Sequence, residues 1–295
     1  MRLFRFGDRG SERPGVVLLS GKRVDVSAFC PDFGENFFSS GGVHQLGAWL
    51  LENGGSCPEV DHSARMGSCV ARPSKIVCVG LNYARHAAEG GLAIPNEPVI
   101  FLKASSALSG PNDEVILPKG SEKTDWEVEL AFVIKRQAAY VAPEDATEYI
   151  AGYCIHNDYS EREFQLERGG QWTKGKSCDS FAPIGPFLVT TDEIRDPHDL
   201  RLWLKVNDVI AQDSNTADMI FRIPVILSYV SQLMTLLPGD VISTGTPEGV
   251  GAGHKPPRYL KEGDVVEYGI EGLGISRQVV VAYEEERKSF IPVRR

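Results

Sequence analysis

The segment from residue 126 to 134, WEVELAFVI, constrains the fold of this chain more than any other. It begins with strictly alternating polar and apolar residues, which is the period of a β-strand. The alternation places Val128, Leu130 and the apolar residues after them on one face, with Glu127 and Glu129 together on the other. The segment therefore predicts a strand that carries two neighbouring carboxylates.

Two carboxylates side by side repel each other unless they are solvated, share a proton or have a cation between them. A second apolar run, residues 150–155, is followed by His-Asn-Asp, which brings Asp158 to the end of another predicted strand. With Glu127 and Glu129 it makes an all-oxygen set that suits a hard divalent cation. The alternative for the two glutamates alone is a solvated strand face, because exposed Glu is common.

Composition and charge narrow the classes of function. The chain has 295 residues, enough for one large and one small domain, and its net charge of −9 argues against a nucleic-acid-binding surface. Its six cysteines form no CxxC pair, which indicates free thiols in a reducing compartment. The N-terminus has no signal-peptide segment, and no apolar run approaches the roughly 18 residues that span a bilayer. We therefore expect a cytoplasmic protein without a membrane partner.

The chain is predicted to have a small N-terminal α+β domain. Its predicted elements are strands at Arg2–Phe6, 15–19 and 23–26, a loop at 30–42 and a short helix at 46–51. Residues 75–80 then form a buried strand and open a new pattern. We place the boundary there, with domains at residues 1–72 and 73–295.

The second domain is predicted to be mainly β with some α. The whole chain contains 30 Gly and 18 Pro, which suits a fold with many turns. Residues 224–237 begin with proline and carry a helical apolar stripe, so they are a predicted helix. Ser160 and Glu163 have capping-box spacing, which predicts a shorter helix that ends at the glycines 169–170. Regular βαβ alternation is missing, which argues against a Rossmann or TIM fold.

Cationic and amide side chains follow Asp158. On the helix predicted from Ser160, Arg162 and Gln165 would share a face, and Lys174 and Lys176 come shortly after. Beside a metal ion, a guanidinium, an amide and an ammonium group would bind a small carboxylate or an enolate. The alternative is a set of surface charges on an amphipathic helix.

Two further motifs carry groups that could take part in catalysis or bind an anion. His86 and Glu89 are three residues apart, so on a helical turn the carboxylate would orient the imidazole and raise its basicity. The Gly/Thr-rich segment at residues 239–251 follows a strand and would let backbone N–H groups approach an anion. The alternatives are an exposed His beside a surface Glu and an ordinary turn.

Taken in order, these motifs resemble the fumarylacetoacetate hydrolase family over residues 73–283. The matching pieces are VGLNYARHAAEGG, EPVIFLKASSALSGPND, DWEVELAFVI, GYCIHNDYSERE, KSCDSFAPIGP, LSYVSQLMTLLPGDVISTGTPEGVGAG and LKEGDVVEYGIEGLG. Any one piece is weak, but their order over this length is specific. The first 70 residues or so resemble the small N-terminal domain that many members carry.

The resemblance implies a fold, an assembly and a site. The fold would be the family's mixed β-sandwich roll, and the assembly a homodimer. Glu127, Glu129 and Asp158 match the family's metal ligands, for Mg²⁺ or Mn²⁺. His86 and Glu89 match its catalytic dyad, which is carried on a lid. The remaining matches are Lys176, expected to be catalytic, and the substrate-binding positions Arg162, Gln165, Tyr159 and Thr246.

The implied activity is metal-dependent hydrolysis of the C3–C4 bond of a small-molecule 2,4-dioxo acid. The substrate would be an acylpyruvate or a 2,4-diketo-3-deoxy sugar acid, and residues 200–208 and 254–260 resemble members that act on diketo sugar acids or are named ureidoglycolate lyases. The products would be pyruvate and a carboxylic or hydroxy acid. Oxaloacetate decarboxylation, tautomerisation and ureidoglycolate cleavage are alternatives on the same site. A silent, metal-stabilised oligomeric binding protein is the alternative without catalysis.

Overall fold

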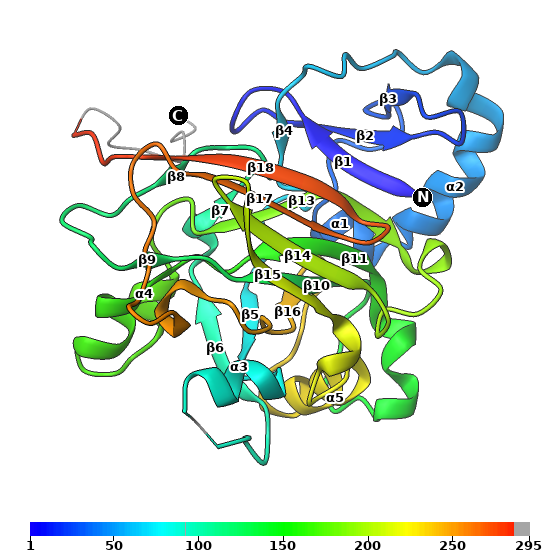
Figure 1. Cartoon of the computed structure of the whole chain (residues 1–295). Coiled ribbons are helices and arrows are strands. Elements are labelled where there is room, and N and C mark those ends of the chain that lie inside the picture. Colours follow the sequence, from blue (N-terminus) through cyan, green and yellow to red (C-terminus); the bar gives the residue numbers. More distant parts are fainter. Residues whose placement is uncertain (92, 286–295) are drawn as a thin grey trace.

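Two β-sheets packed face to face form the body of the protein, as the computed structural model shows for residues 1–91 and 93–285 (Figure 1). The larger, 11-stranded sheet has the order β3-β2-β1-β13-β11-β10-β16-β5-β6, with β4 paired to β1 and β7 paired to β13. Its strands are β1 (Arg2–Phe6), β2 (Arg13–Val17), β3 (Arg23–Asp25), β4 (Met66–Gly67), β5 (Ile76–Gly80), β6 (Val99–Lys103), β7 (Leu108–Ser109), β10 (Val128–Ile134), β11 (Ile150–Asn157), β13 (Ala182–Thr190) and β16 (Val241–Ser243).

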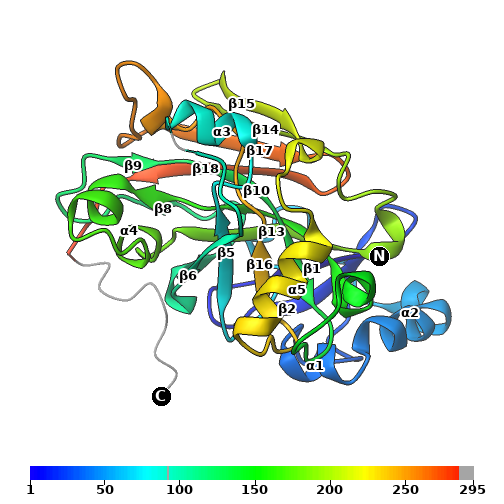
Figure 2. The same cartoon turned by 90° about the horizontal axis from the view of Figure 1, so that it is seen from below.

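The smaller, 5-stranded sheet has the order β15-β14-β17-β18-β8 and covers one face of the larger sheet. Figure 2 shows β14, β17 and β18 in a layer above β10 and β13, and side chains of both layers belong to one hydrophobic cluster. Its strands are β8 (Val115–Ile116), β14 (Arg201–Val206), β15 (Val209–Asn215), β17 (Val265–Ile270) and β18 (Gly274–Val281), and a separate pair is formed by β9 (Thr124–Asp125) and β12 (Ser160–Glu161). The expected mainly β fold with some α is therefore confirmed.

Helices lie around the sheets and in the connections. None in the described part of the chain combines the length and the apolar character needed to cross a bilayer. The α-helices are α1 (Glu35–Ser39), α2 (Gly42–Asn53), α3 (Ala84–Glu89), α4 (Thr173–Lys176) and α5 (Ile223–Leu233). The shorter helical segments are η1 (Gly54–Ser56), η2 (Ser105–Ala107), η3 (Pro143–Tyr149), η5 (Thr191–Glu193), η6 (Thr216–Asp218), η7 (Gly251–Gly253) and the π-helical η4 (Glu163–Glu167).

Strand β10 lies at the centre and is buried on both faces. Val128, Leu130 and Phe132 pack between the two sheets, as the alternation predicts. The opposite face, with Ala131 and Val133, is covered by apolar side chains of the N-terminal segment. Because complete burial of an apolar side chain contributes about 1.5–3 kcal/mol, this strand is fixed in place before any ligand binds.

The N-terminal segment continues the large sheet. Strand β1 pairs antiparallel with β13, so that Arg2 lies opposite Val189 and Leu3 opposite Leu188. Apolar residues of α1 and α2 share a cluster with residues of β5 and β11. The division at residue 72 stays a prediction, and the two parts share a sheet and a core.

Tertiary contacts change the predicted helices. Residues 30–42, expected to be a loop, contain α1, whose Phe37 and Phe38 are buried. The helix predicted over residues 224–237 ends at Leu233, because the chain then extends and Leu236 N–H donates to the carbonyl of Ala138 at 2.9 Å. Pairing with another segment here outweighs the local helical pattern.

The prediction that a helix starts at Ser160 is wrong. Ser160 lies in β12, opposite Asp125, and its hydroxyl donates to the carbonyl of Asp158 at 2.9 Å. The side chain therefore cannot cap a helix, and the helical turn begins later, as the π-helix Glu163–Glu167. Arg162 and Gln165 still meet, because Nη1 of Arg162 donates to Oε1 of Gln165 at 3.0 Å.

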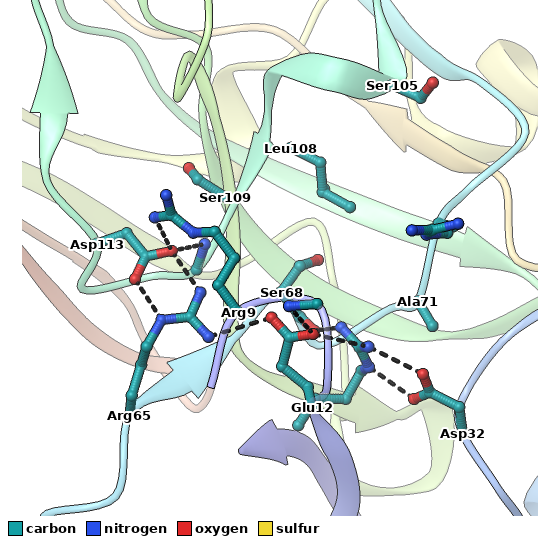
Figure 3. Close-up of a pocket in the computed structure, with 14 residues that line it drawn as sticks. Arg9, Glu12, Asp32, Arg65, Ser68, Ala71, Ser105, Leu108, Ser109 and Asp113 are labelled. Atoms are coloured by element: carbon teal, nitrogen blue, oxygen red, sulfur yellow. Dashed lines mark hydrogen bonds and ion pairs between the residues drawn. The ribbon is translucent and has the colours of Figure 1, made fainter. Parts of the chain in front are cut away.

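An ionic cluster joins the N-terminal segment to the rest of the chain (Figure 3). Arg65 donates to both carboxylate oxygens of Asp113, at 2.8 and 2.7 Å, and to Glu12 at 3.1 Å. Arg9 lies 3.1 Å from the same Asp113 carboxylate. Burial alone would raise the pKa of Asp113, but Arg65 outweighs this effect and lowers the pKa below its ordinary value.

We expect Asp113→Ala to lower the free energy of unfolding by about 2 kcal/mol, because it removes the acceptor of Nε and Nη2 of Arg65 and of the Gly110 N–H. Urea denaturation measures this change. The control is Lys22→Ala, which breaks the ion pair Lys22–Glu59 between side chains that are 60% and 57% exposed. That variant should lose no more than about 0.5 kcal/mol, and equal losses in the two variants would contradict a structural role for the cluster.

Candidate metal centre and active site

Three carboxylates converge where β10 begins and β11 ends. Glu129 pairs across the strands with His156, and the N–H of Asp158 donates to the carbonyl of Glu127 at 2.8 Å. This register brings Glu127, Glu129 and Asp158 together, with one oxygen of each within 4.8 Å of the others. All three are buried, with exposed fractions of 4%, 1% and 0%.

Three buried cations surround this triad. Lys176 Nζ donates to Glu127 and to Asp158, each at 2.7 Å. Lys103 Nζ pairs with the other Asp158 oxygen, and Arg162 lies 2.7 Å from the other oxygen of Glu127. Arg162 also binds the buried carboxylate of Asp125 at 2.7 Å. Four buried carboxylates thus face three buried cations, which leaves a formal charge of −1.

The surroundings shift the pKa values of Glu129 and Asp158 in opposite directions. Burial, with Asp158 and Glu127 as like charges, raises the pKa of Glu129 well above its ordinary value. Burial would also raise the pKa of Asp158, but Lys103 and Lys176 outweigh it and hold that pKa well below the usual range. Of the three carboxylates, Glu129 is the one with the least compensating positive charge around it.

The residues present fit a divalent cation. Hard cations such as Mg²⁺ and Mn²⁺ prefer oxygen ligands, and each carboxylate oxygen has lone pairs for a ligand bond besides its hydrogen bond. Oε2 of Glu129 accepts from the Ser243 hydroxyl at 2.5 Å and from the Gly245 N–H at 3.0 Å. Both of these bonds are made to Oε2, so neither of them occupies the lone pairs of Oε1.

A buried histidine supports Glu129 through Ser243. His156 is fully buried, and its Nδ1 lies 2.7 Å from the Ser243 hydroxyl oxygen. Because that hydroxyl donates its proton to Glu129, Nδ1 carries the proton that the hydroxyl accepts. Burial lowers the pKa of His156 to about 3, so the ring is neutral at pH 7.

The predicted dyad lines the same cavity as Glu127 and Glu129. His86 and Glu89 are on α3, and Nδ1 of His86 is 3.6 Å from Glu89 Oε2, slightly beyond hydrogen-bond distance. The Gly249 N–H lies 3.1 Å from both oxygens of Glu89. A Cβ at Gly253 would lie 2.2 Å from Cδ of Glu89, so only glycine lets this loop approach the carboxylate.

This cavity collects most of the predicted site residues. It encloses about 160 Å³ between α3, the start of β10 and the segment from Arg162 to Lys176. The predicted residues that line it are His86, Glu89, Glu127, Glu129, Arg162, Gln165, Lys176 and Thr246. Asp158 lies behind the lining and touches it through Lys176.

Tyr159 is the predicted residue that the structure does not bring to the cavity. It is fully buried, its hydroxyl donates to Gln278 at 3.2 Å, and its ring packs against Phe181. Neighbouring residues in an extended segment point to opposite sides, so Asp158 and Tyr159 cannot both face the metal centre. Tyr159 is not among the residues that line the cavity, and its contact with substrate stays a prediction.

Several residues of the site were missed by sequence reasoning. Lys103 lies far from the triad in sequence and reaches it only because β6 pairs with β5 at the sheet edge. Asp125 anchors Arg162 and also accepts from the Gly251 N–H at 2.6 Å. The signal for Asp125 was present, since it directly precedes the strand with the two glutamates. His156 and Ser243 had no signal of their own.

Comparisons with known proteins point to one family. Residues 75–281 match the family described as fumarylacetoacetate (FAA) hydrolase C-terminal. A Burkholderia multivorans protein that is provisionally named a hydrolase is 50% identical over 283 residues, which is 96% of this chain and 99% of that protein.

Solved structures extend the comparison. Maleylpyruvate hydrolase from Sphingobium sp. SYK-6, in complex with manganese(II) ion and pyruvate, has a TM-score of 0.80 and 31% identity, and the match covers 96% of this chain and 100% of that chain. 5-Carboxymethyl-2-hydroxymuconate delta-isomerase from Mycobacterium smegmatis has a TM-score of 0.74 and 33% identity, with 97% and 100% covered. Both hydrolases and isomerases therefore have this fold.

We expect Glu129→Gln to weaken Mn²⁺ binding by more than about 100-fold, because it removes the negative charge of one of the three candidate ligands. It should also raise the Tm of the metal-free protein, because it removes a carboxyl whose charge is disfavoured by burial and by its neighbours. Isothermal titration and thermal unfolding measure the two effects. The control is Glu161→Gln, another fully buried carboxyl, which binds backbone N–H groups outside the triad. Equal Mn²⁺ affinities in the two variants would contradict the metal assignment.

His156 should make stability depend on pH. Above its ordinary pKa of 6.5 the ring is neutral in both states and contributes nothing. As the pH falls towards 3, the unfolded chain binds a proton that the folded chain refuses, so stability falls by up to about 1.4 kcal/mol per pH unit. In EDTA, urea denaturation between pH 6.5 and 5 should show a smaller loss for His156→Asn than for the wild type. Parallel curves would contradict a neutral buried ring.

Proposed function

The chain belongs to the fumarylacetoacetate hydrolase family, and we propose that it hydrolyses the C3–C4 bond of a 2,4-dioxo acid with the help of Mg²⁺ or Mn²⁺. The observation that carries this proposal is that Glu127, Glu129, His86 and Glu89 all line one cavity. A structural metal alone would need neither an imidazole nor an open cavity beside it.

Glu127, Glu129 and Asp158 are the groups that would hold the metal. A divalent metal bound there supplies Lewis acidity, which polarises the carbonyl group of a 2-oxo acid. Arg162 and Lys176 line the same cavity and orient the carboxylate end of the substrate by charge. Both are already fixed by ion pairs to Glu127, so they need little reorganisation when substrate binds.

His86 is the proposed general base. Glu89 holds the side of the ring that carries Nδ1, so Nε2 is the nitrogen available to a water molecule. His86 takes one proton from this water, and the hydroxide adds to the C4 carbonyl carbon. Burial would raise the pKa of Glu89, but the nearby His86 and the Gly249 N–H outweigh this effect and lower it, so this carboxylate stays charged and stabilises the protonated ring.

The bond between C3 and C4 then breaks with its electron pair on the C3 side. Negative charge develops on the pyruvate unit, where Lys176 and Arg162 lie close enough to stabilise it. The proton held by His86 returns to C3. One 2,4-dioxo acid and one water give pyruvate and a carboxylic or hydroxy acid.

Other reactions of a 2-oxo acid would use the same groups. Isomerisation needs proton transfer without water addition, and it is the activity named for one of the matched structures. Oxaloacetate decarboxylation needs no attacking water, and ureidoglycolate cleavage would release glyoxylate. The position of His86 beside a carboxylate favours activation of water, so hydrolysis is the first proposal.

Assembly and location are also proposals. A homodimer is expected because the family resemblance implies one. A reducing compartment such as the cytoplasm suits the cysteines, which are all free thiols, including the buried Cys69, Cys78 and Cys154.

Pyruvate release tests the proposed reaction. Acetylpyruvate, a 2,4-diketo-3-deoxy sugar acid, oxaloacetate and ureidoglycolate are each incubated with enzyme and Mg²⁺ or Mn²⁺, and with EDTA. Lactate dehydrogenase detects pyruvate, and glyoxylate is measured separately. We expect turnover of a dioxo acid that EDTA abolishes. Turnover of oxaloacetate alone or of ureidoglycolate alone would replace hydrolysis by decarboxylation or lyase activity.

We expect His86→Ala to keep Mn²⁺ affinity within about threefold and to lower kcat by about 100-fold or more, because general-base catalysis contributes that much. Single-turnover kinetics and Mn²⁺ titration measure the two effects. Arg85→Ala, on the same helix with its side chain 68% exposed, is the control for helix integrity. Full activity of His86→Ala would contradict the assigned role.

A further inference from the structure

Six apolar side chains line the same cavity and form its apolar region. They come from several elements that are far apart in sequence: β5, β6, the π-helix, the loop before α4 and the loop after β16. The side chains of this region are Val79, Leu81, Phe101, Leu166, Trp172 and Val250. A substrate held at its 2-oxo acid end would place its tail among these side chains.

Two aromatic rings form one wall of this region. The rings of Phe101 and Trp172 meet edge to face, with centroids 5.4 Å apart at 61°. A Cβ on Gly80 would lie 2.5 Å from the Trp172 ring, so the absence of a side chain there makes room for the indole. Lys176 Nζ lies 5.0 Å from the centre of the Phe101 ring, which joins this wall to the cation that binds Glu127.

The apolar region offers no cation for a charged tail. Among the described residues that line the cavity, the only Lys and Arg side chains are Lys176 and Arg162, and both already pair with Glu127. Glu89 also lines the cavity, and its pKa lies below the ordinary value, so it repels a second anion. A tail carboxylate would be desolvated here without a partner.

The charge balance around the three carboxylates suits a substrate with a single carboxylate. The buried groups around the triad have a formal charge of −1, which a divalent cation changes to +1. One carboxylate on the substrate then brings the sum to zero. A second would leave excess negative charge in a region from which the protein excludes water.

The volume limits the size of the tail. The cavity holds about 160 Å³, and an apolar cavity of about 150 Å³ accommodates one benzene molecule. A six- or seven-carbon oxo acid with a short alkyl tail has about this size. Long tails would have to extend past Leu166, whose side chain is 55% exposed at the edge of the cavity.

We propose that the substrate is a 2,4-dioxo monocarboxylate with a compact, uncharged and apolar tail, held against the Phe101–Trp172 wall. This inference rests on the proposed function and narrows it. It disfavours dicarboxylates, whose second charge would have no partner, and polyhydroxylated tails, whose hydroxyl groups would lose water without gaining hydrogen bonds. Hydrolysis would then release pyruvate and a short apolar carboxylic acid.

A matched pair of substrates tests the proposal. 2,4-Dioxoheptanoate and 2,4-dioxoheptanedioate have the same chain length and differ only in a methyl group or a carboxylate at C7. We expect kcat/KM to be about 100-fold or more higher for the heptanoate, and higher for it than for 5,6-dihydroxy-2,4-dioxohexanoate. Equal or better turnover of the dioate or the dihydroxy acid overturns the tail assignment but leaves hydrolysis standing. No turnover of any of the three overturns the proposed function itself.

Leu166 provides a charge-reversal test at the edge of the cavity. We expect Leu166→Arg to lower the ratio of kcat/KM between heptanoate and heptanedioate by about tenfold or more, because it gives the tail carboxylate a partner. Leu166→Gln is the matched control, since it adds polarity without charge, and its ratio should stay near that of the wild type. Equal ratios in the two variants would show that the tail does not reach this edge and would overturn the placement.

A substitution at Trp172 tests whether the aromatic wall contacts the substrate tail. Trp172→Ala should lower kcat/KM for 2,4-dioxoheptanoate more than for acetylpyruvate, by about tenfold, because the longer tail loses its contact surface and the methyl tail does not reach it. The effect should appear in KM, with Mn²⁺ affinity unchanged. An equal loss for the two acids would mean that Trp172 acts on the fold and not on the tail, and would contradict its assignment as a specificity residue.

Discussion

Four carboxylates buried beside three cations are the constraint on which the rest of the structure depends. Buried charges are tolerated only when they are paired and hydrogen-bonded, and here Lys103, Lys176 and Arg162 each bind at least one carboxylate. Glu129 forms no ion pair with these three cations, and burial, together with the charges of Asp158 and Glu127, raises its pKa. A divalent cation bound there would relieve the repulsion among Glu127, Glu129 and Asp158 that the three buried cations leave uncompensated.

The fold holds this arrangement by strand register. Adjacent antiparallel strands β10 and β11 place Glu129 opposite His156, and a shift of one residue would send every carboxylate to the opposite face. Packing on both faces of β10 makes such a shift costly. Helix α3 brings His86 and Glu89 to the same cavity, and a loop donates the Gly249 N–H to Glu89.

Much of the site could be predicted because many of its residues belong to short sequence patterns. The alternation around Glu127 and Glu129 and the His86–Glu89 spacing both appear in the structure as expected. Lys103 could not be predicted, because its contact with Asp158 depends on how β6 joins the sheet edge. The helix expected from Ser160 failed for a similar reason, since pairing of Ser160 with Asp125 competes with a local capping pattern. Local periodicity predicts elements, whereas long-range pairing decides which of them meet.

Anomalous diffraction from crystals grown with Mn²⁺ and pyruvate tests the central claim most directly. The account predicts one strong manganese peak bonded to Glu127, Glu129 and Asp158, with pyruvate beside it in the cavity lined by His86, Arg162 and Lys176. The apolar wall formed by Phe101 and Trp172 should lie on the methyl side of the bound pyruvate. Manganese elsewhere, or a triad that stays empty at metal concentrations that support turnover, would contradict the account.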